Sequence, residues 1–214
     1  YKKRALSELE QERSDPDFLA QEQMYRALYG TFPAARTSPT AASIQGLTAD
    51  ELRKFHNQYY QPGNALLGVV GDFDAKQMTA LLEKYLGTWK GQPFTAPKMG
   101  ALPAPAPFKI YLVDRPDSVQ TNILAGELTV PRNNPDYIPL RVMNRVLGEG
   151  STGRLFLNLR EEKGYTYGAY SFIAADTYPR PLLANTEVRT AVTDGSMHEL
   201  LGEFKRIRDE VVPE

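Results

Sequence analysis

The chain has 214 residues, and its formal net charge of −1 gives no reason to expect nucleic acid or an anionic membrane as a partner. Its 42% hydrophobic and 24% charged residues are typical of an ordinary globular protein. It contains no cysteine, which excludes disulfides, thiolate metal sites and thiol catalysis and fits either a bacterial periplasm or the cytoplasm. No apolar run approaches the roughly 20 residues that span a bilayer.

The first 90 residues predict mainly helices. Apolar spacing indicates a helix from Tyr1 to about Tyr29 with a break near Pro16, because proline interrupts a helix. Thr48 and Glu51 form the pattern of a capping box, which predicts a helix up to about Tyr60. The remaining elements expected here are a loop at 31–46, a buried strand at 65–70 and a helix at 74–89.

Five prolines between residues 91 and 107 predict a stiff, extended linker. This linker divides the chain into residues 1–90 and 108–214. In the second part we expect, in chain order, strands at 108–113 and 120–130, a helix at 136–147, a short helix, a tyrosine-rich strand at 165–170, a strand at 181–190 and a helix at 195–208. The predicted fold class is α+β, with antiparallel sheets covered by helices.

Gly148, Gly150 and Gly153 match the pattern G-x-G-x-x-G. A nucleotide-binding loop of this pattern directly follows a strand inside a βαβ unit. Here the preceding residues have helical periodicity, so a joint between two helices is the alternative interpretation. A helix before Gly148 in the structure would exclude nucleotide binding.

The segment 147–170 carries the candidate site. Arg160 lies near the end of the short helix and Tyr167 on the strand that follows, so a cation and a phenol from adjoining elements could meet one peptide carbonyl. The alternative is a charged helix end next to aromatic residues that pack a sheet. Strand alternation predicts Tyr165 and Tyr167 on one face and Tyr170 on the other.

Only two histidines are present, His56 and His198, and neither has a second ligand at the spacing of a zinc site. Glu8 stands in an acidic run that is typical of a solvated helix face. It could also complete a zinc site whose histidines come from elsewhere.

Several phrases in order resemble the pitrilysin/insulinase family of zinc metallopeptidases, which includes mitochondrial processing peptidases and bacterial zinc proteases. The phrases are 47–52 (LTADEL), 55–64 (FHNQYYQPGN), 69–73 (VVGDF), 85–89 (YLGTW), 120–123 (QTNI), 153–156 (GRLF) and 158–167 (NLREEKGYTY).

The resemblance implies paired α+β domains that close around a peptide substrate. The zinc would lie in the first domain, held by an inverted H-x-x-E-H motif and a downstream glutamate. Glu8 falls at the position of that glutamate, and Arg160 and Tyr167 fall on a substrate-contacting pair of the second, inactive domain. Residues 1–90 would be the second half of the first domain and 108–214 most of the second.

The chain departs from the family pattern in having no H-x-x-E-H motif, so we expect the histidine ligands to lie upstream of Tyr1. Alone, the chain is then expected to lack peptidase activity and tight zinc binding. A non-catalytic subunit that partners a zinc-bearing peptidase is the alternative function. Uncovered sheet edges lead us to expect self-association of the chain.

Overall fold

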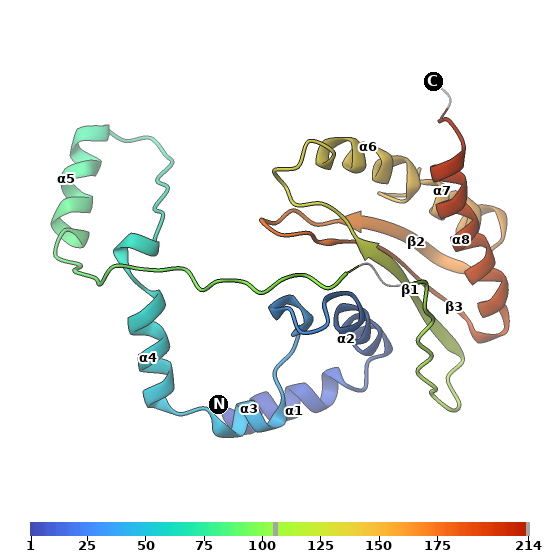
Figure 1. Ribbon diagram of the computed structural model, residues 1–214, viewed down its shortest axis with the longest axis horizontal. Coiled ribbons are helices and arrows are strands. Elements are labelled where there is room, and N and C mark those ends of the chain that lie inside the picture. Colours follow the sequence, from blue (N-terminus) through green and yellow to red (C-terminus); the bar gives the residue numbers. More distant parts are fainter. Residues whose placement is uncertain (105–106, 213–214) are drawn as a thin grey trace. The chain divides into compact units, whose positions relative to one another are not determined.

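The structure is a computed structural model that describes residues 1–104 and 107–212. Contacts divide the chain into two compact units, one of residues 1–6 and 39–99 and one of residues 7–38 and 100 onward. The boundary falls inside the first helix, α1 (Lys2–Glu12). Each unit is described by itself below (Figure 1).

The first unit consists mainly of helices, α3 (Ala41–Gly46), α4 (Ala49–Tyr59) and α5 (Ala75–Leu86), with a short 3₁₀ turn, η2 (Pro62–Asn64). The predicted capping box of α4 is confirmed. The Glu51 N–H donates to Thr48 Oγ1 at 3.2 Å, and the Thr48 N–H donates to Glu51 Oε2 at 2.7 Å. Both bonds satisfy donors that the first turn of a helix leaves free, so they fix where α4 begins.

Two predictions for this region are wrong. The expected loop at 31–46 contains a 3₁₀ turn, η1 (Pro33–Ala35), and α3, which has its own capping box between Thr40 and Ser43. The expected strand at 65–70 is neither paired nor buried, and Leu66 and Val70 are almost fully exposed. A strand needs a neighbour to accept its backbone hydrogen bonds, and no described residue pairs with this segment.

The second unit contains a three-stranded antiparallel sheet, which confirms the predicted α+β class. Its strands are β1 (Gln120–Leu128), β2 (Thr166–Ile173) and β3 (Pro181–Arg189), and β3 lies between the other two. The expected strand at 108–113 is wrong, since these residues lie outside the sheet with their apolar side chains exposed.

Helices on one side of this sheet cover the main core (Figure 1). They are α6 (Tyr137–Leu147), the single turn α7 (Arg154–Phe156), the turn η3 (Leu157–Glu162) and α8 (Thr193–Asp209), and a 3₁₀ turn, η4 (Thr190–Val192), leads into α8. Leu147, Leu155, Leu159 and Leu200 from these helices pack with the alternate sheet residues Ile123, Ala169, Ala184 and Val188.

The break predicted near Pro16 is confirmed, since α2 (Pro16–Tyr29) starts at this proline and Asp15 caps it. The helix leads into a second cluster of buried aromatic residues. The Tyr29 ring lies against Phe32 and Tyr178, and its hydroxyl donates to the Pro179 carbonyl at 2.9 Å. This bond ties α2 to the connection between β2 and β3.

Candidate functional site

The turn that carries Arg160 is a π-turn. The Lys163 N–H donates to the Asn158 carbonyl at 2.9 Å, five residues back instead of the four of an α-helix. Leu155 and Leu159 are fully buried and anchor α7 and η3 in the core. The sequence predicted a short helix here but not its wider hydrogen-bond pattern, which occurs frequently at functional sites.

Arg160 and Tyr167 lie on adjoining elements that pack against each other, η3 and β2. The Arg160 side chain is 42% exposed and its nearest carboxylate is Glu161, at 3.8 Å. Tyr167 is 91% exposed. The two side chains form no hydrogen bond with each other, but the Tyr165 N–H donates to the Leu159 carbonyl at 2.9 Å, so a short backbone link joins the two elements.

A β-bulge places Tyr167 at the surface. Thr166 pairs with Val188 and Ala169 with Thr186, so β2 has one residue more than β3 across this interval. The predicted alternation is therefore wrong. Tyr165 packs against the core, while Tyr167 is turned into solvent. Bulges occur frequently at sheet edges beside active sites, where they redirect side chains.

The glycine loop, residues 148–153, covers part of the free edge of β2. The Gly148 carbonyl accepts the Ser171 N–H at 2.9 Å, and the buried Asn144 side chain bonds both the hydroxyl and the carbonyl of Ser171, at 2.8 and 3.3 Å. A Cβ at Gly148 would lie 2.6 Å from Ser171 Oγ, so glycine allows this close approach. Because the loop follows α6 and not a strand, the nucleotide-binding interpretation is wrong.

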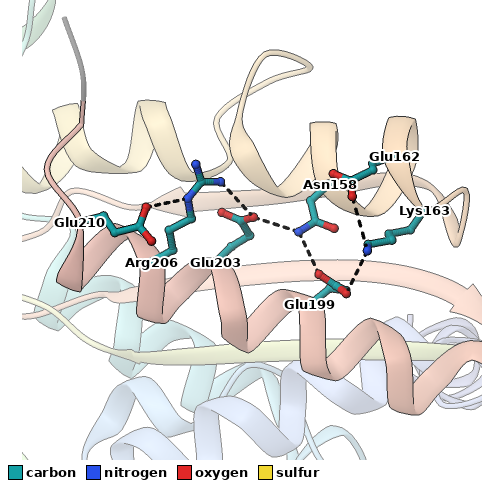
Figure 2. A network of polar contacts seen from close by, with 7 residues as sticks. All are labelled: Asn158, Glu162, Lys163, Glu199, Glu203, Arg206 and Glu210. Atoms are coloured by element: carbon teal, nitrogen blue, oxygen red, sulfur yellow. Dashed lines mark hydrogen bonds and ion pairs between the residues drawn. The ribbon is translucent and has the colours of Figure 1, made fainter.

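A polar network joins η3 to α8 (Figure 2). The Asn158 amide donates to Glu199 Oε2 at 3.1 Å and to Glu203 Oε1 at 2.9 Å. The Lys163 ammonium lies 3.3 Å from Glu199 Oε1. The hydrogen bond from Asn158, followed by the ion pair with Lys163, lowers the pKa of the Glu199 carboxyl. Sequence reasoning missed this network, whose only signal was the i, i+4 spacing of the two glutamates on one helix.

The described residues hold no group of three or more His, Asp and Glu side chains that could bind a metal ion. His56 lies on α4 and stacks on Tyr60, His198 is exposed on α8, and Glu8 is exposed on α1. The described residues therefore do not fit a complete zinc site. Over the same described ranges, no helix is long and apolar enough to cross a membrane.

Comparison with known proteins finds relatives that are named as zinc proteases. An uncharacterised zinc protease of Mycobacterium tuberculosis is 29% identical over 169 residues, covering 78% of this chain and 38% of that protein. The uncharacterised zinc protease YmxG of Bacillus subtilis is 27% identical over 161 residues, covering 73% of this chain and 37% of that protein. The chain thus spans less than half the length of these relatives.

Among solved structures, a peptidase M16 inactive domain from Pseudomonas fluorescens superposes with a TM-score of 0.87 at 27% identity, over 99% of this chain and 51% of that one. A protease from Helicobacter pylori has the same fold, with a TM-score of 0.84 at 19% identity over 100% of this chain and 52% of that one. The profile of the family described as Peptidase M16 inactive domain matches residues 46–214, and the chain therefore belongs to this family.

Proposed function

We propose that this chain is the substrate-contacting part of a zinc-dependent peptidase whose metal centre lies largely outside it. The observation that carries the proposal is the placement of Arg160 and Tyr167. An exposed phenol at a strand bulge and a half-exposed guanidinium on a π-turn lie on two elements that the backbone bond from Tyr165 to Leu159 joins. Family membership supports the assignment to a peptidase.

The chemistry of the two side chains suits a peptide carbonyl. A guanidinium offers several N–H donors and a phenol one O–H donor. The Tyr167 hydroxyl has no hydrogen-bond partner among the described residues, so it is available to a substrate. Donors placed where negative charge develops on a carbonyl oxygen stabilise the transition state, and losing one typically costs about 10²–10³ in turnover. Arg160 and Tyr167 would act in this way, or would anchor a neighbouring peptide unit.

Glu8 is the one residue of this chain that we propose as a ligand of the zinc ion. Glu8 is an exposed residue of α1, and the remaining ligands would come from outside these residues. No step of the reaction at the metal is assigned to this chain. We expect the isolated chain to bind no stoichiometric zinc at micromolar concentration, measured by metal analysis after dialysis with a chelator control. Tight one-to-one binding would contradict the proposal that the other zinc ligands lie outside these residues.

The test of the site is Tyr167→Phe in the full-length protein. Loss of the hydroxyl should lower kcat for a fluorogenic peptide by about 10²–10³ if the hydroxyl contacts the transition state. The matched control is Tyr170→Phe, which removes the same hydroxyl from the same strand at a ring that packs on Phe156. Unchanged kcat and KM in Tyr167→Phe would rule out the proposed role.

A second candidate is a non-catalytic subunit that completes the substrate chamber of a zinc-bearing partner. It is favoured by the family's description as an inactive domain. Peptidase assays of the purified full-length protein, with and without a partner peptidase, separate the two functions. Activity of the protein alone supports the first function, and activity only with the partner supports the second.

A further inference from the structure

We propose that Glu199 and Glu203 of α8, acting through Asn158, are positioning residues that hold the π-turn and thereby place Arg160 against the substrate. The inference rests on the proposed function of Arg160. It adds residues from a helix that lies after Arg160 by about forty positions and that carries no substrate contact in the proposal above.

The π-turn is closed twice. Its backbone ring runs from the Asn158 carbonyl to the Lys163 N–H, 2.9 Å apart. The side chains of the same two residues are bridged by Glu199, whose Oε2 accepts from Asn158 at 3.1 Å and whose Oε1 lies 3.3 Å from the Lys163 ammonium. Arg160 lies inside the ring that both connections close. Figure 2 shows the bridge from Glu199 reaching the two residues.

Glu203 adds a second restraint on Asn158. Its Oε1 accepts the other Asn158 hydrogen bond at 2.9 Å, and the residue is only 5% exposed. A carboxylate this deeply buried is costly unless it is hydrogen-bonded or paired. Arg206 lies 3.7 Å from Glu203 Oε1 and also bonds Glu210 at 3.0 Å, so the helix itself supplies a compensating charge at this oxygen, while Glu203 Oε2 is buried with no hydrogen-bond partner among the described residues. The fixed carboxylate in turn fixes the amide of Asn158.

A π-turn needs such restraints because its backbone hydrogen bonding is unusual. The π-helix is rare and appears mostly as single turns inside α-helices. Without the side-chain bridge, the segment could relax to ordinary i→i−4 bonding. Such a relaxation would rotate the residues inside the ring about the helix axis, and the guanidinium of Arg160 would leave its position. The same change would disturb the Leu159 carbonyl that accepts from Tyr165.

The experiment is a double-mutant cycle in the full-length protein, with kcat and KM measured on a fluorogenic peptide. Asn158→Ala removes the hydrogen bond to Glu199, which is one half of the bridge, and the hydrogen bond to Glu203. We expect it to lower kcat by about tenfold or more, with little change in KM, and to have an effect below about twofold in an Arg160→Ala background. Asp209→Asn is the control, since this carboxylate lies on the same helix and pairs with Arg208.

Two further measurements keep the inference testable if Asn158→Ala loses stability. Glu199→Gln keeps the size of the bridging side chain and removes its charge, so its kcat should fall less, again only while Arg160 is present. Hydrogen exchange should speed up at the amides of Lys163 and Tyr165 in either variant, because these amides bond the carbonyls of the π-turn.

The outcomes distinguish a failure of the positioning role of Asn158 from a failure of the proposed role of Arg160. If Arg160→Ala lowers turnover and Asn158→Ala has the same effect in both backgrounds, the inference is overturned and the proposed function stands. If Arg160→Ala leaves turnover unchanged, the proposed role of Arg160 fails and the inference fails with it. Unchanged exchange at Lys163 and Tyr165 in Asn158→Ala would also overturn the inference, whatever the activity.

Discussion

Gly148→Ala tests the close contact between the glycine loop and the edge of β2. The φ of Gly148 is −166°, outside the left-handed region that favours glycine, so the expected effect is argued from steric contacts. The added methyl would lie 2.6 Å from Ser171 Oγ, 2.7 Å from Ser171 N and 2.8 Å from Leu155 Cδ1. All three atoms are within the range that real Cβ contacts avoid, so either the loop or the strand must move.

The magnitude follows from what this movement breaks. Overpacking of a core typically costs about 1–3 kcal/mol. Moving the loop would also weaken the Ser171–Gly148 hydrogen bond and the two hydrogen bonds between Asn144 and Ser171, each worth about 1 kcal/mol. Replacing glycine also lowers the entropy of the unfolded chain, which stabilises the folded state by about 0.4–1 kcal/mol. We therefore expect a net loss of about 2 kcal/mol.

The assay is urea unfolding followed by circular dichroism, with a thermal melt in parallel. A loss of about 2 kcal/mol corresponds to a fall in Tm of about 4–8 °C for a chain of this size. The matched control is Gly202→Ala, because Gly202 lies inside α8 with no atom within 4 Å of the added Cβ. It should stabilise the protein by about 0.5–1 kcal/mol. A Gly148→Ala variant as stable as the wild type would refute the packing argument.

Three other outcomes are expected. Tyr29→Phe loses the hydrogen bond to Pro179 and should lower the free energy of unfolding by about 1 kcal/mol, measured by urea unfolding. The lowered pKa of Glu199 means that its stabilisation is present above its unfolded-state pKa and is lost as pH falls through the lower folded-state pKa, so wild type and Glu199→Gln should converge in stability at acid pH. Sedimentation velocity of the isolated chain should show self-association, because 65–70 and 108–113 expose apolar side chains, and a clean monomer at high concentration would contradict this.

Local signals predicted most of the helices. The Thr48–Glu51 box, the Asp15–Pro16 start of α2 and the apolar stripe of α6 each determine structure within one or two turns, and all three are present. The α+β class followed from the order of such elements. The π-turn was out of reach because its pattern depends on side chains from α8, about forty residues later in the chain.

In the candidate site, too, features set by local sequence could be predicted and features set by distant segments could not. Arg160 and Tyr167 could be named from a cation and a phenol on adjoining elements, and they remain predictions until tested. Their surroundings could not be predicted. The bulge that exposes Tyr167 depends on the pairing of β2 with β3, and period-2 alternation assumes a regular strand. The residues that bridge the turn, Asn158 and Glu199, were invisible because hydrogen bonds between distant segments leave no periodic signal.

Two predicted strands do not form, and the reason lies in their lack of a pairing partner. Residues 65–70 and 108–113 have the apolar, β-branched composition that favours a strand, yet the structure leaves both unpaired and exposed. Composition reports that a segment fits a half-buried pleated surface, but only a neighbour can supply the hydrogen bonds of a ladder. β1 and β2 became strands because β3 offered an edge to each. A strand prediction is thus a statement about two segments, and where a segment's partner is missing from the described residues, the apolar pattern identifies a surface ready to pair.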